Sequence, residues 1–134
     1  MLALSRGDDG AMAARKAWDN KLQGYMSSPV VVAGHAYLHL RNNRFACVDL
    51  TSGEIRWTTS EKFTDYASLV ANRDRILMLD QKGSLHLVAA DPGGFRRLAE
   101  RKISEEETWA HLAVAGNELF VREQTAIAAF VWRP

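Results

Sequence analysis

The stretch Cys47-Val48-Asp49-Leu50-Thr51-Ser52-Gly53-Glu54-Ile55-Arg56-Trp57 decides the fold of this chain. It lies inside a segment whose pattern recurs further along the sequence. The phrase Val32-Ala33-Gly34, followed by apolar residues, returns as Val70-Ala71-Asn72 and as Val114-Ala115-Gly116. Repeats of roughly 40 to 50 residues with strand-like content are typical of propeller blades. The sequence therefore predicts a repeat protein built from β-strands.

The stretch resembles the tryptophan-docking motif of the PQQ-like, or quinoprotein-type, β-propellers. The five marked positions of that motif fall on Cys47, Asp49, Ser52, Gly53 and Trp57. Asp49, Gly53 and Trp57 match in identity, whereas the other two are small substitutes. In the resembled family the tryptophan packs between adjacent blades and its indole donor bonds to the neighbouring sheet. The resemblance implies the same role for Trp57, which we favour over a role as a ligand-stacking platform.

The residues from Cys47 to Trp57 suit a structural role. Gly53 permits a turn conformation that a side chain would resist. Asp49 can accept hydrogen bonds from backbone donors in that turn. Trp57 supplies a large apolar body, and Cys47, in a small-residue position, reads as a buried packing residue and not as a nucleophile.

We predict an all-β chain of about three propeller blades plus a partial one, each blade a four-stranded antiparallel meander. The predicted divisions are the end of a preceding blade (1–26), two blades (27–60 and 65–104) and a terminal blade (108–134). The segment from Ala13 to Trp18 reads as a strand or as a short helix; as a strand, it makes Trp18 the counterpart of Trp57. In the second blade Ala89 and Asp91 keep the register of the motif, but no tryptophan follows.

This number of blades falls short of the usual minimum of about four for a closed propeller. Terminal repeats without caps expose apolar faces. We therefore favour a C-terminal fragment of a larger propeller, and we expect self-association through blade faces or edge strands if it stands alone.

Composition limits the classes of partner. The chain has 134 residues, of which 47% are hydrophobic, and a formal net charge of +1. This balance predicts no general attraction to nucleic acid. No run of about 18 apolar residues is present, so we expect no membrane insertion, and the N-terminus is a poor signal peptide. The single cysteine excludes an intrachain disulfide.

The sequence gives little support for an enzyme. The four histidines lie in separate units, apart from His35 and His39, whose spacing lacks the pattern of a metal-binding helix. The pair Asp8-Asp9 lacks the later acidic ligand of a calcium loop. Glu105-Glu106-Glu107 reads as a solubilising loop. The PQQ-dependent enzymes of the resembled family commonly carry adjacent cysteines and calcium ligands, which this chain lacks, so we expect no cofactor, no metal and no catalytic residue.

The favoured function is a non-catalytic scaffold that binds a protein partner, as in the outer-membrane-assembly branch of the family. Loops on a rigid frame commonly carry binding. The candidate surface consists of hairpin-turn residues: Arg41, Asn42, Asn43, Arg44, Gln81, Lys82, Glu123 and Gln124. The alternative is a fragment of a PQQ-dependent dehydrogenase or of a carbohydrate-active propeller, with active residues on other blades. By family analogy alone, the parent protein belongs to the periplasm or cell envelope of a bacterium.

Overall fold

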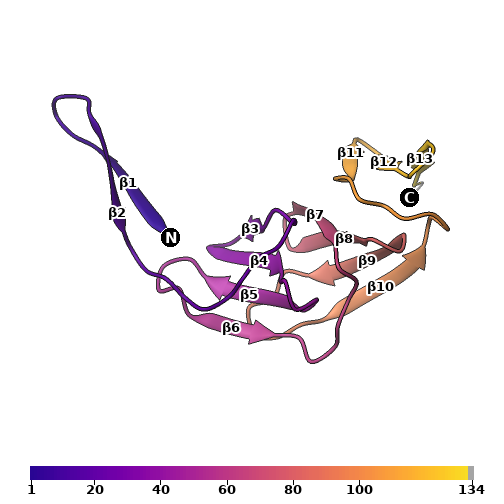
Figure 1. The fold of residues 1–134 in the computed structure, drawn as a ribbon, viewed down its shortest axis with the longest axis horizontal. Helices are drawn as coiled ribbons and strands as arrows, with labels where there is room; N and C mark the ends of the chain where they lie inside the picture. The colour runs from indigo at the N-terminus through magenta and orange to yellow at the C-terminus, as the bar shows by residue number, and fades with distance from the viewer. Residues whose placement is uncertain (133–134) are drawn as a thin grey trace.

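The computed structural model describes residues 1–132, in which every regular element is a β-strand (Figure 1). The strands form a two-stranded hairpin, two four-stranded antiparallel sheets and one three-stranded sheet. Within each sheet the strands follow one another in chain order. The chain is thus an open, partial β-propeller, and the predicted fold class is confirmed. No membrane-crossing helix is found in residues 1–132.

The N-terminal hairpin pairs β1 (Leu2–Arg6) with β2 (Met12–Lys16). Its turn includes Gly10 at φ 80°, and Asp9 caps the turn by accepting a hydrogen bond from the Ala11 N–H. In Figure 1 this hairpin projects away from the sheets, and its side chains are largely exposed. The segment that the sequence left open between strand and helix is therefore a strand, although it ends at Lys16.

The first complete blade contains β3 (Val30–Val32), β4 (His35–His39), β5 (Phe45–Asp49) and β6 (Ile55–Thr58). Tyr37 and His39 of β4 are buried, and all four residues from Phe45 to Val48 of β5 are buried, so both faces of β5 are covered. The turn between β3 and β4 is Ala33-Gly34, with both residues at positive φ, and His35 already belongs to the strand.

The second blade contains β7 (Ala67–Asn72), β8 (Arg75–Asp80), β9 (Ser84–Ala89) and β10 (Arg97–Lys102). The third contains only β11 (Ala113–Ala115), β12 (Glu118–Arg122) and β13 (Ile127–Val131). The innermost strands β3 and β7 lie side by side. Residues 133 and 134, which the predicted terminal blade includes, lie outside the described residues.

Two apolar cores hold the three blades together. The larger core joins the first and second blades through Tyr37, Phe45, Ile76 and Met78, all essentially buried. Trp57, Phe63 and Phe95 pack against it. The smaller core joins the second and third blades through Leu79, Leu112, Leu119 and Val121. Burial between neighbouring blades is the main stabilising term of such a fold.

The Val-Ala repeat that suggested the blades is not in structural register. Val32 pairs with His35 next to its turn, whereas Val70 pairs with Leu77, two residues deeper in its strand. The residue that occupies the place of Val32 in the second blade is Asn72, paired with Arg75. The repeated phrase identified repeated strands correctly because strand positions favour β-branched residues wherever the register lies.

Candidate functional site

The segment from Cys47 to Trp57 forms the outer hairpin of the first blade. The Asp49 carboxylate accepts hydrogen bonds from the backbone N–H groups of Ser52 (3.0 Å) and Thr51 (2.8 Å), which hold the pKa of this carboxyl below its ordinary value. The Ser52 hydroxyl accepts from the Glu54 N–H at 3.2 Å. Across the two strands, Cys47 pairs with Trp57. The polar side chains therefore fix the turn, and the tryptophan leaves it on the outer strand.

Trp57 reaches from the first blade into the second. Its indole N–H donates to the Asp91 carbonyl at 2.9 Å. The ring lies among Tyr37, Phe45 and Phe95, with ring centroids about 6 Å apart (6.0, 5.9 and 6.0 Å, respectively). Tilted and edge-on contacts at such distances are favourable for aromatic pairs. One side chain thus combines an apolar contact between blades with a directed hydrogen bond.

Trp18 makes the same kind of contact one repeat earlier. Its indole N–H donates to the Leu50 carbonyl at 2.8 Å, in the outer turn of the first blade. Asn20 adds a bond from its side-chain amide to the Gly53 carbonyl at 3.2 Å. The structure therefore gives Trp18 the position that the sequence predicted for it as the counterpart of Trp57.

The second blade has no tryptophan in this position. Leu87 in the second blade corresponds to Cys47 in the first. Cys47 pairs with Trp57 on the outer strand, whereas Leu87 pairs with Ala99. The Ala90 N–H donates to the Asp74 carbonyl, just as the Leu50 N–H donates to the Gly34 carbonyl. The residues before these two donors, Ala89 and Asp49, therefore occupy the same place in their blades. The predicted register of Ala89 and Asp91 was wrong, because the turn between β9 and β10 is longer than the turn between β5 and β6.

The predicted partner-binding residues lie in three turns, each joining the second and third strands of a blade. Arg41, Asn42, Asn43 and Arg44 lie between β4 and β5; Gln81 and Lys82 lie between β8 and β9; Glu123 and Gln124 lie between β12 and β13. The structure does not gather all eight at one spot. The first two turns instead contact the connector that leads from their blade to the next.

Three of these side chains form bonds to a connector. Asn43 donates from its amide to the Asp65 carboxylate at 2.8 Å. The Arg44 guanidinium donates to the carbonyls of Thr59 and Ser60. Gln81 donates to the Glu107 carboxylate at 2.9 Å. These residues fix the shape of the loop face, by which we mean the surface formed by these turns and the connectors bonded to them. Arg41, Asn42 and Lys82 are more exposed to solvent.

The connectors supply residues that the sequence reasoning missed. Tyr25 and Met26, about half exposed at 50% and 51%, precede β3, and Trp109, at 38%, precedes β11. Met26, Tyr66 and Trp109 lie the same number of residues before the first turn of their blades. Tyr66 is buried and stacks on Trp109 with a centroid distance of 5.8 Å. Connectors lack the strand period, so only the equal spacing from the turns could have revealed this set.

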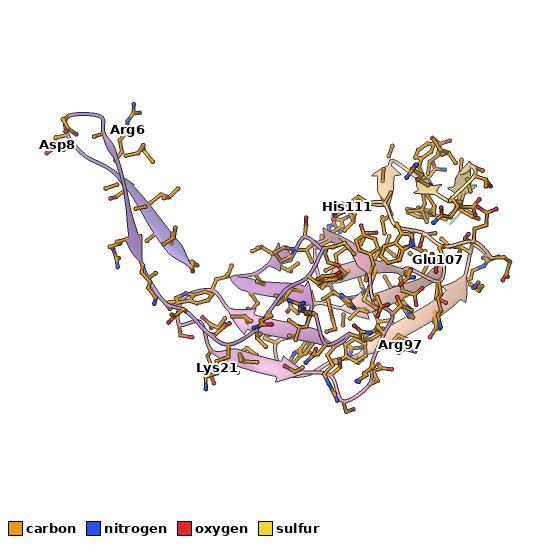
Figure 2. The ribbon with its side chains drawn as sticks, viewed as in Figure 1. Arg6, Asp8, Lys21, Arg97, Glu107 and His111 are labelled. Carbon is orange, nitrogen blue, oxygen red and sulfur yellow. The ribbon has the colours of Figure 1, made fainter. Side chains whose placement is uncertain are left out.

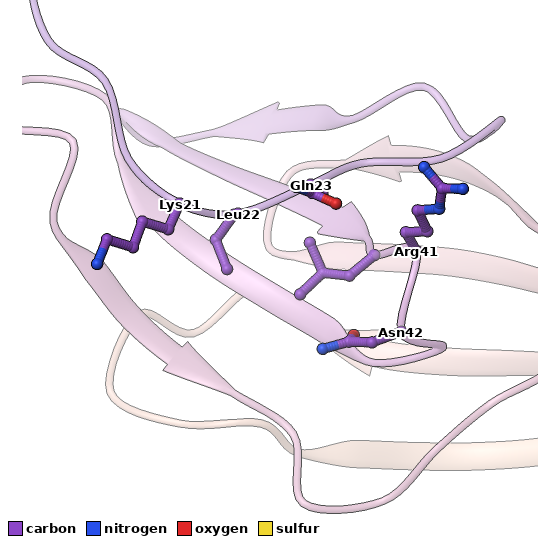
Figure 3. Close-up of a pocket in the computed structure, with 6 residues that line it drawn as sticks. Lys21, Leu22, Gln23, Arg41 and Asn42 are labelled. Carbon is purple, nitrogen blue, oxygen red and sulfur yellow. The ribbon is translucent and has the colours of Figure 1, made fainter.

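Two hollows adjoin on this loop face. The first, of about 330 Å³, lies between the connector from Lys21 to Gln23 and the turn from Leu40 to Asn42 (Figure 3). The second, of about 280 Å³, is lined by Tyr25, Met26, Arg41, Asn43, Asp65 and Trp109. Arg41 lines both, and its guanidinium lies over the Tyr25 ring, 5.9 Å from the centroid. Figure 2 shows Glu107 and His111 on the connector that continues this face toward the third blade.

Buried polar groups lie between the strands. His86 is enclosed near Asp80 and Glu100, with its Nε2 3.4 Å from the Asp80 carboxylate. Burial favours a neutral Asp80, but the bonds from His86 and from the Ser84 N–H outweigh it and lower the pKa of this carboxyl. Burial raises the pKa of the Cys47 thiol. The free thiol of Cys47 is therefore held neutral inside the blade, unsuited to nucleophilic work.

The histidines do not converge. His35 forms a hydrogen bond between its Nδ1 and the Ala33 carbonyl, and His39 forms one between its Nε2 and the Thr64 carbonyl, each at 2.9 Å. Burial lowers the pKa of His39. Across residues 1–132 the structure places no group of three or more histidine, cysteine, aspartate or glutamate side chains to hold a metal ion. Asp8 lies in the tip of the projecting hairpin, as Figure 2 shows.

Comparison with known proteins agrees with the blade geometry. Residues 5–59 match the family model PQQ_2, described as outer membrane protein assembly factor BamB. No curated protein matches the chain. BamB from Moraxella catarrhalis is similar with a TM-score of 0.69 and 14% identity, over 97% of this chain and 42% of that chain.

A europium-containing methanol dehydrogenase is similar with a TM-score of 0.62 and 20% identity, over 87% of this chain and 25% of that chain. The chain thus spans less than half the length of either structure. At these identities the two likenesses establish the fold alone. The family match lies on the segment that carries Trp18, Gly53 and Trp57. Residues 5–59 therefore match the PQQ-like repeat family, and the two structures show that the chain has the fold of β-propeller blades.

Proposed function

We propose that this chain is a non-catalytic β-propeller module whose loop face binds a protein partner. The observation that carries the proposal is the exposure of Tyr25, Met26, Arg41 and Trp109 on one face. Tyrosine, tryptophan, methionine and arginine are the side chains enriched in the centres of protein interfaces. Tyr25, Met26 and Trp109 lie on connectors that are bonded to the turns of two packed blades, and Arg41 lies in one of those turns.

The frame beneath this face is rigid enough to present it. The Arg41 N–H donates to the Gln23 carbonyl at 2.9 Å, and Gly24 forms a β-bridge with Leu40. The Thr108 N–H donates to the Gln81 carbonyl at 2.8 Å. A surface held in this way loses little conformational entropy when a partner binds. The description of the matching family, an outer membrane protein assembly factor, supports a place in the cell envelope for the parent protein.

Photo-crosslinking in the parent protein tests the proposal. Benzoylphenylalanine replaces Met26 in one variant and the exposed Asp74, in the turn between β7 and β8, in the control. We expect one discrete protein adduct from position 26 that is absent from position 74. Equal adducts from both positions, or none from position 26, would contradict binding through the loop face.

A titration separates this proposal from a dehydrogenase fragment. If the parent protein is a quinoprotein enzyme, adding PQQ with Ca²⁺ gives a saturable change in the absorbance of the quinone. Under the scaffold proposal the spectrum stays that of free PQQ. The variant Arg41→Gln then weakens partner binding without altering the quinone spectrum.

A further inference from the structure

We propose that the two hollows of the loop face together bind an extended acidic peptide segment, with a carboxylate in the first and an apolar side chain in the second. This inference rests on the proposed function and specifies the chemistry of its partner. Both hollows have a volume that suits single side chains, about 330 and about 280 Å³.

The first hollow is basic. Its lining consists of Lys21, Leu22, Gln23, Leu40, Arg41 and Asn42, so among the described residues it carries two cations and no carboxylate (Figure 3). Neither cation forms an ion pair within residues 1–132. Some arginines elsewhere on the surface are paired, as Arg56 is with Glu54 and Arg97 with Glu61, but in this hollow two unpaired cations line one space. A carboxylate from a partner supplies the charge that this hollow lacks.

The second hollow is suited to an apolar side chain. Tyr25, Met26 and Trp109 form the apolar part of its lining, beside the polar Arg41, Asn43 and Asp65. Trp109 is held in place by stacking on Tyr66 and by its indole bond to Glu107 at 2.8 Å. Its one carboxylate, Asp65, already accepts a bond from Asn43. Methionine adapts to differently shaped apolar groups, so this pocket accepts leucine-like or aromatic anchors.

Arg41 connects the two hollows. It lines both, and its guanidinium lies over Tyr25, which keeps the planar cation at the boundary between the basic and the apolar wall. A partner that places acidic and apolar side chains at neighbouring positions therefore meets both hollows at once. A basic segment meets Lys21 and Arg41 and is repelled.

The test uses the 134-residue chain and a blocked octapeptide, acetyl-Gly-Ser-Glu-Glu-Leu-Leu-Ser-Gly-amide, followed by NMR of the tryptophan indole N–H signals. We expect the Trp109 signal to shift in a saturable manner, while Trp18 and Trp57, bonded to carbonyls between blades, stay unchanged. Two control peptides replace both glutamates by lysine or both leucines by serine. Each is expected to bind at least about fivefold more weakly, the factor that an exposed charge pair or a small apolar contact confers.

Two variants and one matched control locate the site. Arg41→Gln is expected to weaken binding of the glutamate-leucine peptide about fivefold, to the affinity of the lysine peptide. Tyr25→Ala is expected to weaken it similarly while preserving the preference for glutamate over lysine. Arg75→Gln removes an exposed arginine next to the turn that follows β7, away from both hollows, and is expected to change nothing. Unchanged Trp57 signals show that each variant is folded.

Three results overturn the inference: equal binding of the three peptides, shifts at Trp132 in place of Trp109, or an Arg41→Gln variant that binds like the original chain. If crosslinking through position 26 succeeds while these peptides fail, the loop face binds protein but not by this chemistry. If crosslinking fails as well, the proposed function falls with it.

Discussion

The indole ring of Trp18 lies directly against Gly53, so closely that a β-carbon on the glycine would stand 2.5 Å from the ring. Gly53 also has a φ of +77°, in the region that residues with side chains avoid. The glycine is thus required twice, by its own backbone and by the tryptophan of the preceding unit. This relationship couples the glycine turn of the first blade to the tryptophan that precedes the blade.

The first prediction follows from that double requirement. Gly53→Ala should lower the free energy of unfolding by roughly 2–4 kcal/mol, from the left-handed backbone and from overpacking against Trp18. Gly34→Ala is the matched control, since Gly34 has a φ of +78° but no neighbouring atom within 4 Å of an added β-carbon. Its loss should be about 1–2 kcal/mol. Urea unfolding measures both, and equal losses would show that Trp18 does not pack on Gly53.

The second prediction concerns Trp57. Trp57→Ala should destabilise the chain by about 3–5 kcal/mol, because it empties the aromatic contact between two blades. Trp57→Phe retains most of that contact but leaves the Asp91 carbonyl without its donor, at a cost of about 1 kcal/mol beyond the lost volume. Urea unfolding again provides the values. Trp132→Ala, at an exposed position, should cost less than either, and the reverse order would refute a joining role for Trp57.

The third prediction is a pH dependence of stability. The pKa of Asp80 is lower in the folded chain than its ordinary value of 3.8, so its ionised form favours folding. This contribution is fully present above the ordinary pKa and is lost as the pH falls through the lower folded value. Asp80→Asn should therefore be less stable than the original chain at pH 6, by about 1–3 kcal/mol, and nearly equal to it well below pH 3. Denaturant titrations at both pH values check this, and a difference independent of pH would exclude ionised Asp80 as the cause.

The fourth prediction is self-association. Large apolar side chains are exposed on the projecting hairpin and on β13, among them Leu2, Leu4, Ile127 and Val131. Light scattering over a concentration series should show a rise above the 15.0 kDa of one chain toward a discrete dimer. Ile127→Lys should reverse that rise, whereas Thr51→Lys, in an exposed turn, should not. A constant mass of 15.0 kDa at all concentrations would contradict association through these faces.

The sequence predicted the strands well where local chemistry determines them. The strand from Ile55 to Thr58 illustrates this, because a glycine turn precedes it and its side chains suit a strand. The longer turn after β9 misled the alignment of Asp91, since a few additional turn residues shift the register without changing the strand pattern. The pairing of Arg75 with Asn72, and not with a valine, likewise depends on where the turn closes.

The candidate site was predicted only in part. Arg41 and Asn42 were identified because polar hairpin turns are exposed, and they line the first hollow. Tyr25, Met26 and Trp109 were missed because irregular connectors have no period to follow. Asn43 and Arg44 were identified by the same rule as Arg41, but they bond to the neighbouring connector. Only the folded arrangement distinguishes a turn residue that faces a partner from one that holds a loop.

Hydrogen exchange of the four indole N–H groups tests the central claim most directly, because the account gives each tryptophan a different task. Trp18 and Trp57 join consecutive units through bonds to Leu50 and Asp91, while Trp109 stands exposed on the loop face that we propose as the binding surface. The account predicts slow exchange at Trp18 and Trp57 and faster exchange at Trp109 and Trp132. Slow exchange at Trp109 would contradict the exposure of the loop face. Rapid exchange at Trp57 would contradict its joining of the two blades.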